Sequence, residues 1–360
     1  MKNKGIIPIL ILVLITLILS GCTDFLIDGS TTYQSHSTRI SYTLNYGYKV
    51  NCTSSDEFEH YEITYDCDVP EALNGQIVST VANDNSYENK TLATFNVVKS
   101  WDIHSNENKE YALGITASVV SESYNVADLN GANALSIADI SSSLVDQYCQ
   151  AQSTDTTTYI DPNNPNIKAK ANEIYNIGGT NNSFLVAKEL FIWLKQQTAY
   201  RIHLTDSNVQ PAGDTFLCKT GDCDDLSFLY ISLCRSLGIP ARFIRGFLIE
   251  VDTATPHAWV EVYVGGGVGN NGWIPVECAG ISSNAETEVN QNFAIESADH
   301  LRLFMDDGSN ESINISMSGL SYVTYGDMIV EATYYSEVTD YTVLRSNELV
   351  IDEDGIRSYK

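Results

Sequence analysis

Apolar and polar residues alternate in short segments along the first third of the chain. Examples are Ile40-Tyr42-Leu44 and Ile63-Tyr65, and turns rich in Asn, Asp and Ser separate such segments between Arg39 and Ser123. Alternation with a period of two places the apolar side chains on one face of a strand. The pattern therefore predicts an antiparallel, β-sandwich-like N-terminal domain with one solvent-facing side, which we assign to residues 23–150.

The pattern changes after this β-rich region. Residues 153–166 are mostly Ser, Thr, Asp, Asn and Pro, which predicts a linker over residues 151–166. Ser183 then caps a predicted helix whose apolar residues recur at helical spacing, from Phe184 to Leu194. Residues 286–360 return to alternating Tyr, Val, Ile and Thr, so we expect extra strands there, as a C-terminal β extension.

A second amphipathic helix is predicted to begin near Cys223 and to end at Gly238, with Pro240 just beyond. Its apolar stripe consists of Leu226, Leu229, Tyr230, Leu233 and Leu237. Unpaired N–H groups and the helix dipole stabilise an anion at a helix N-terminus, so the position of Cys223 favours its thiolate. The flanking Asp222, Asp224 and Asp225 oppose that charge, so a cationic partner is needed.

Two predicted strands downstream supply this partner. The segment from His257 to Val264 alternates strictly and places His257, Trp259 and Glu261 on one face. The glycine-rich stretch 265–272 reverses the chain into a strand that ends at Glu277 and Cys278. Such a hairpin would bring Glu277 beside His257, where a carboxylate orients the imidazole and stabilises its protonated form.

These segments together resemble the transglutaminase-like superfamily, a papain-like fold of cysteine enzymes. The resemblance rests on four ordered motifs: Gly221-Asp222-Cys223-Asp224-Asp225, Leu237-Gly238-Ile239-Pro240-Ala241-Arg242, His257-Ala258-Trp259-Val260-Glu261-Val262-Tyr263 and Gly272-Trp273-Ile274-Pro275-Val276-Glu277. It covers about residues 167–280, and we assign residues 167–285 to a catalytic domain. The resemblance implies an α+β fold in which a helix packs on an antiparallel sheet.

The resemblance also implies roles for three residues. Cys223 would be the nucleophile, His257 the general base and acid, and Glu277 the third member of the triad. The family usually has Asp at this last position, so Glu277 is a departure that is one methylene longer. No metal and no cofactor is implied.

The first 22 residues predict a targeting segment. Lys2 and Lys4 precede an apolar stretch from Gly5 to Leu19, which is shorter than the ~20 residues that a membrane span needs. It ends in Leu19-Ser20-Gly21-Cys22, which resembles the lipobox of prokaryotic lipoproteins. We therefore expect a signal peptide over residues 1–22, lipidation at Cys22, and an exported protein anchored to the outer face of the cytoplasmic membrane. The alternative is an uncleaved N-terminal anchor.

Composition narrows the possible partners. The chain has 360 residues, 43% of them hydrophobic, and its 20 basic and 46 acidic side chains give a formal net charge of −26. So many apolar residues exclude a fully disordered chain. The negative charge repels phosphate backbones, so we expect no nucleic acid partner.

The cysteines divide into classes once export is considered, because exported proteins can form disulfides. Eight are present, and setting aside Cys22 leaves an odd number. Cys52 with Cys67 and Cys218 with Cys278 are the possible disulfides. Cys234 lies on the apolar stripe of its helix, so we expect it to be a buried core residue.

The expected function is that of a cell-surface cysteine enzyme acting on peptide or amide bonds. The substrate would be a peptide, a protein or a cell-wall polymer, and hydrolysis is the preferred outcome. Two alternatives remain open at this point. One is a protein cross-linking acyltransferase, and the other is a catalytically inert surface protein that binds peptides or has a structural role.

Overall fold

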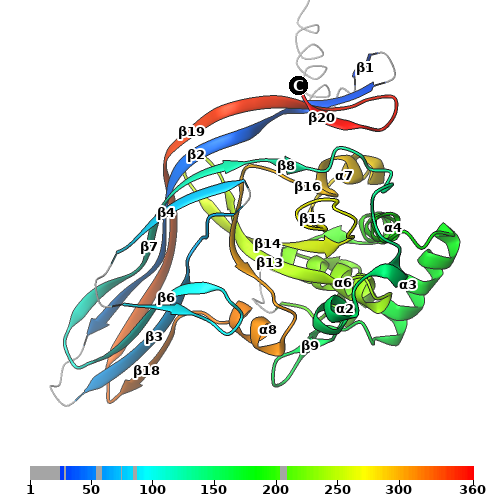
Figure 1. Ribbon diagram of the computed structural model, residues 1–360. Helices are drawn as coiled ribbons and strands as arrows, with labels where there is room; N and C mark the ends of the chain where they lie inside the picture. The colour runs from blue at the N-terminus through cyan, green and yellow to red at the C-terminus, as the bar shows by residue number, and fades with distance from the viewer. Residues whose placement is uncertain (1–24, 28–29, 54–58, 74, 84–86, 203–208) are drawn as a thin grey trace, which may run out of the picture.

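The computed structural model describes residues 25–27, 30–53, 59–73, 75–83, 87–202 and 209–360. The predicted signal peptide, including Cys22, lies outside these residues. The described chain combines a mostly β part, on the left in Figure 1, with a part in which helices pack on a sheet. No helix within the described ranges is long and apolar enough to cross a membrane.

The larger sheet of the β part is built on very long strands. Its central strand β2 is flanked by β7 on one side and by β19 on the other, with antiparallel pairing throughout. Its strands are β1 (Phe25–Ile27), β2 (Ser30–Thr53), β4 (Gln76–Ala82), β7 (Lys109–Glu122), β19 (Ile329–Ile351) and β20 (Arg357–Tyr359).

A second antiparallel sheet faces part of the first. Its strands are β3 (His60–Asp68), β5 (Glu88–Thr91), β6 (Val97–Ser105) and β18 (Ser321–Tyr325), in the order β18-β3-β6-β5. Alternate residues of both sheets form one hydrophobic core in which Tyr61 and Trp101 are fully buried. This is the sandwich predicted from the alternating pattern.

A third sheet, of four strands, belongs to the helical part. Its order is β15-β14-β13-β17, all antiparallel, with β13 (Ala241–Ile249), β14 (Ala254–Tyr263), β15 (Trp273–Val276) and β17 (His300–Met305). Its helices are α2 (Ser142–Tyr148), α3 (Pro165–Gly178), α4 (Ser183–Gln197), α5 (Ala212–Cys218), α6 (Cys223–Ser236), α7 (Ala285–Asn292) and α8 (Asn310–Ser316). Short elements connect them: a 3₁₀ turn at Ile137–Asp139, β8 (Tyr124–Asn125), β9 (Gln152–Ser153), β10 (Thr158–Ile160), β11 (Ala199–Tyr200), β12 (Thr220–Gly221) and β16 (Ile295–Glu296).

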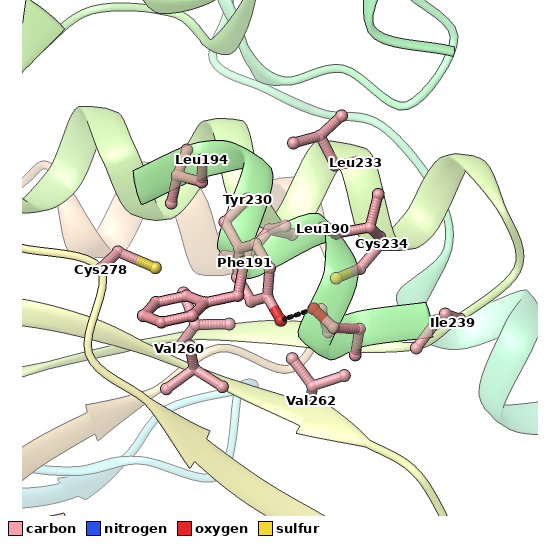
Figure 2. Close-up of a cluster of buried hydrophobic side chains, with 14 of the residues drawn as sticks. Leu190, Phe191, Leu194, Tyr230, Leu233, Cys234, Ile239, Val260, Val262 and Cys278 are labelled. Carbon is pink, nitrogen blue, oxygen red and sulfur yellow. Dashed lines mark hydrogen bonds between the residues drawn. The ribbon is translucent and has the colours of Figure 1, made fainter. Parts of the chain in front are cut away.

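Helix α6 is the central element of this helical core. Its apolar stripe packs on Val260 and Val262 of β14, and α4 covers its other side (Figure 2). The hydroxyl of Tyr230 donates to the carbonyl oxygen of Ala187 at 2.9 Å, so the polar tip of this buried ring is satisfied. As predicted, Gly238 follows the helix with a positive φ of 78°.

The domain limits differ from those expected at three places. The β-rich domain assigned to residues 23–150 ends earlier, because Leu129 is buried in the helical core and the Tyr148 ring of α2 meets Trp273 edge-on. Residues 151–166 do not form a free linker, because Ile160 is fully buried in the core beside α6 and the N–H of Asp161 donates to Ser232. Residues 286–360 do not form one extension. Strand β17 completes the core sheet beside β13, whereas β18 and β19 pair with β3 and β2.

Candidate active site

Cys223 is the first residue of α6, as the sequence predicts. A capping box fixes this helix start: the side chain of Asp222 accepts from the backbone of Asp225, and the Asp225 carboxylate accepts the N–H of Asp222 at 3.1 Å. Asp225 is fully buried and also accepts the N–H of Gln210 at 2.6 Å. The reciprocal bonds hold Cys223 at a defined place on the first turn.

The surroundings of the thiol oppose its ionisation. Burial raises the pKa of Cys223 well above its usual range, and the charges of Asp224 and Asp222 raise it further. The backbone N–H of Ala258 donates to the sulfur and acts in the opposite direction. Since Ala258 follows His257 on β14, this contact brings the thiol to the strand that carries the predicted base.

His257 and Glu277 meet as the predicted hairpin requires. Strand β15 pairs with β14 in the register Val260↔Val276, so Glu277, one residue further, lies on the same face as His257. The Nε2 atom of His257 lies 2.6 Å from Oε2 of Glu277, and both side chains are largely buried. The other carboxylate oxygen accepts the N–H of Ala279 at 2.6 Å.

The carboxylate is held in its charged form. Burial alone would raise the pKa of Glu277, but the charge and hydrogen bond of His257, reinforced by His300, keep it well below the usual range. Glu277 is therefore an anion at neutral pH and can stabilise an imidazolium at His257.

His300 is a fourth member of this cluster that the sequence analysis missed. Its Nε2 atom lies 3.0 Å from the same oxygen of Glu277 that binds His257. Its Nδ1 atom lies 2.9 Å from Oδ1 of Asp299 and 2.8 Å from the hydroxyl of Ser297. Burial lowers the pKa of His300, but the hydrogen bonds that it donates to the carboxylates of Asp299 and Glu277 outweigh this and raise it to about 10. The only signal in the sequence is an Asp-His pair before a short alternating segment, which carries no motif.

Comparison with known proteins supports the resemblance seen in the sequence. The model of the transglutaminase-like superfamily matches residues 168–278. We refer to residues 168–278, which match this model, as the transglutaminase-like core. A curated relative, the uncharacterized protein YebA of Bacillus subtilis strain 168, is 35% identical over 80 residues, which are 18% of this chain and 10% of YebA.

One solved structure extends the likeness beyond this transglutaminase-like core. A protein from Cytophaga hutchinsonii, proposed to be a cysteine protease, has a TM-score of 0.55 at 15% identity and covers 92% of this chain and 100% of its own. This likeness shows a shared fold that includes the sandwich. The periplasmic domain of TgpA from Pseudomonas aeruginosa covers 70% of this chain and 93% of its own at 13% identity, with a TM-score of 0.33.

A buried ionic network supports the transglutaminase-like core beneath His257. The indole N–H of Trp259 donates to Glu296 at 2.9 Å, and its ring stacks on His257 and meets His300 edge-on. Arg302 binds both Glu296 and Glu261, with 2.6 Å from its Nη1 atom to Oε1 of Glu261. Every charge in this network has an opposite partner, which fixes the rings behind the site.

Neither predicted disulfide is formed, and all seven cysteines within the described ranges are free. The Cys52 thiol contacts Tyr61, whereas Cys67 contacts Tyr46. Tyr61 and Cys67 are six positions apart on β3, about 20 Å of strand, so the two thiols are too distant to bond.

The second predicted pair, Cys218 and Cys278, lies in two different environments. Cys218 is exposed at the end of α5, and its sulfur lies 3.1 Å from the carbonyl oxygen of Thr220. Cys278 is fully buried beside Lys195 and Cys234. Cys234 is itself a fully buried core residue, as expected.

Proposed function

We propose that the protein is an exported cysteine hydrolase that cleaves peptide or amide bonds through an acyl-enzyme. The observation that carries the proposal is the juxtaposition at β14. The Cys223 thiol contacts the N–H of Ala258, and the adjacent His257 is hydrogen-bonded to Glu277 at 2.6 Å. A nucleophile, a base and an orienting carboxylate are the parts that covalent acyl transfer requires.

The first half of the reaction forms a thioester. His257 takes the thiol proton, since Glu277 occupies Nε2 and leaves Nδ1 as the nitrogen that exchanges it. The thiolate attacks the carbonyl carbon, and the imidazolium gives its proton to the departing amine as the C–N bond breaks. Glu277 stabilises the imidazolium that exists between these steps.

The second half returns the free enzyme. A water molecule gives one proton to His257 and attacks the thioester carbonyl, and the C–S bond breaks. The products are a carboxylic acid and the thiol, which recovers its proton from His257. Hydrolysis is favoured because water is the most abundant acceptor.

The negative oxygen of each tetrahedral intermediate needs donors. The backbone N–H of Cys223 at the start of α6 is the first candidate. Tyr200 is our side-chain candidate, because it pairs in register with Gly221, two residues before the nucleophile. Burial and the nearby charges of Cys223 and Asp222 raise the pKa of Tyr200 to about 12, so its hydroxyl keeps the proton that it would donate.

The test is product analysis with a peptide library and a dansylated primary amine as a competing acceptor. We expect wild type to release new carboxyl termini, and Cys223→Ala to release none. Products labelled with the amine would instead indicate a cross-linking acyltransferase. Equal activity of the two proteins would rule out Cys223 as the nucleophile.

The proposed location is the outer face of the cytoplasmic membrane, with surface peptides or wall polymer as substrates. It rests on the lipobox-like Leu19-Ser20-Gly21-Cys22. Membrane fractionation of wild type and Cys22→Ser tests it: the variant should leave the membrane fraction. A variant that remains there with an uncleaved N-terminus would favour the uncleaved anchor.

A further inference from the structure

A cleft of about 360 Å³ lies where the sandwich meets the core. Its sandwich side includes Tyr48 of β2, Tyr65 of β3 and Tyr334 of β19, and its core side includes Phe247 and Pro256. No step of the proposed chemistry uses the sandwich residues of this cleft. The proposed reaction therefore does not explain why these residues line the cleft.

The cleft lies beside the catalytic helix. Helix α6 has 14 residues, about 21 Å of helix, and a tight turn leads from its end into β13, which packs along it. About six residues of a strand cover the same length. Because β13 begins beside the end of α6 and runs back along it, its residues Arg245 and Gly246 lie near the start of α6. The charge of Arg245 indeed acts on Asp224, the residue after Cys223.

The catalytic base is equally close. Gly246 lines the cleft and is the register partner of His257, and Pro256, another lining residue, immediately precedes His257. A peptide that presents a carbonyl group to Cys223 can therefore place a neighbouring side chain in the cleft.

The wall of the cleft is aromatic. The Tyr48 ring meets Tyr65 edge-on at 5.2 Å and Tyr334 at 5.4 Å between ring centroids. Each cation–π contact that we find in the described chain involves other rings, so these three have no protein cation over them. Aromatic faces attract cations, and they also pack against the aliphatic stem of a long side chain.

The charge of the cleft is negative. Asp66 and Asp68 both line it. Among the described residues the sole lining cation is Arg245, which is already bound to Asp68 and to the carbonyl oxygen of Ser316. Within the described ranges, Asp66 has no cationic partner. Burial raises the pKa of Asp68, Arg245 lowers it, and the nearby charge of Asp66 raises it again, so Arg245 is one cation beside two carboxylates.

We propose that this cleft binds the basic side chain, Lys or Arg, of a peptide substrate next to the bond that is cleaved. The stem of that side chain packs against Phe247 and the tyrosine rings, and its charged end faces Asp66. An ammonium group held by a carboxylate stays protonated, so it is recognised and not acylated. The inference rests on the proposed function, because it names the substrate class of that site.

Binding to the Cys223→Ala protein tests the inference without any chemistry. The probes are blocked tripeptides Gly-Lys-Gly, Gly-norleucine-Gly and Gly-Glu-Gly, with dissociation constants from isothermal titration or NMR. We expect the lysine peptide to bind about tenfold more tightly than the norleucine peptide, and the glutamate peptide more weakly than both. Asp66→Asn should remove most of this preference. Asp354→Asn, a matched change in the exposed turn between β19 and β20, should leave it intact.

Two results would overturn the inference. One is equal or absent binding of the lysine peptide, and the other is a lysine preference that survives Asp66→Asn. Failure of the proposed function is distinguishable, since it would appear as no peptide cleavage by wild type while the binding preference persists. Cleavage by wild type without any preference for basic residues would contradict the cleft assignment alone.

Discussion

One oxygen of Glu277 accepts hydrogen bonds from two imidazoles, those of His257 and His300. The other oxygen is held by the backbone of Ala279. Glu277 is one methylene longer than the usual Asp, and its carboxylate has three hydrogen-bond partners. This arrangement compensates for the longer side chain, because each bond removes freedom that Glu would otherwise have.

The first prediction concerns the charge of Glu277. Glu277→Gln preserves the shape but cannot stabilise the imidazolium, so we expect kcat/KM on a cleaved peptide to fall by roughly 10²–10⁴-fold. Thermal unfolding should show that the variant is folded. A variant that is folded and retains more than half of the wild-type kcat/KM would remove Glu277 from the catalytic group.

The second prediction concerns His300 and pH. Its pKa is raised from 6.5 to about 10 in the folded protein, so its ion pair stabilises the fold fully below pH 6.5 and loses this effect as the pH rises through 10. We expect the free energy of unfolding of wild type to fall by roughly 2–5 kcal/mol relative to His300→Gln over this window. Urea unfolding of both proteins at several pH values measures it. Parallel pH profiles would show that His300 is not the charged partner of Glu277.

Helix α6 places its thiol through its N-terminal cap and not through its apolar stripe alone. Asp225 bonds the backbone of both Asp222 and Gln210, so it connects the helix start to the loop before α5. Other helices here have ordinary caps, such as Asn284 on α7, whose side chain accepts from Glu286 and Thr287.

The third prediction compares these two caps. Asp225→Ala should cost about 1–3 kcal/mol of stability and also lower kcat, because the position of Cys223 changes. Asn284→Ala should cost about 1 kcal/mol without changing kcat. Chemical unfolding and initial rates on both variants check this. An equal effect of both on kcat would mean that the Asp225 cap does not set the thiol geometry.

The sequence predicts the features that depend on local patterns, and it does not predict the features that depend on pairing between distant strands. Helix α6, strand β14 and strand β15 each carry a local signal, and together they place Cys223, His257 and Glu277 correctly in the fold. His300 reaches Glu277 only because β17 pairs with β13, and no local pattern records that pairing. The same reason explains why the sequence pattern predicts one extension that includes β18 and β19, although β19 pairs with β2, some 300 positions earlier. The linker prediction is wrong for a different reason. Most residues of that segment are polar and typical of turns, so its composition does not indicate that Ile160 is buried.

The sandwich and the core are joined through a charged contact as well as through apolar packing. Arg245 of β13 binds Asp68 of β3 and the carbonyl oxygen of Ser316, and Tyr46 packs edge-on against Phe247. After the core sheet, the chain returns to the sandwich, where β19 pairs with β2 (Figure 1). Residues of both parts line the cleft that we propose to bind the substrate side chain.

The fourth prediction tests this junction. Arg245→Met leaves Asp68 largely buried without its cation, so we expect a loss of about 2–4 kcal/mol, which Asp68→Asn in the same protein should partly restore. Arg345→Met removes the exposed pair with Glu122 and should cost less than about 1 kcal/mol. Denaturant unfolding of the variants measures both losses of stability. Equal costs would show that the junction adds no more than a surface ion pair.

The reactivity of Cys223 tests the central claim most directly. Iodoacetamide is applied to the native protein at about pH 6, and mass spectrometry follows Cys223, with the exposed free thiol Cys218 as an internal reference. Burial and the neighbouring carboxylates raise the pKa of the Cys223 thiol, so fast labelling requires proton transfer to His257. We predict that this transfer makes Cys223 react at least about tenfold faster than Cys218, and that His257→Gln removes the difference. A Cys223 that reacts no faster than Cys218, or that is indifferent to His257→Gln, would contradict the assignment of this site as a cysteine enzyme's catalytic group.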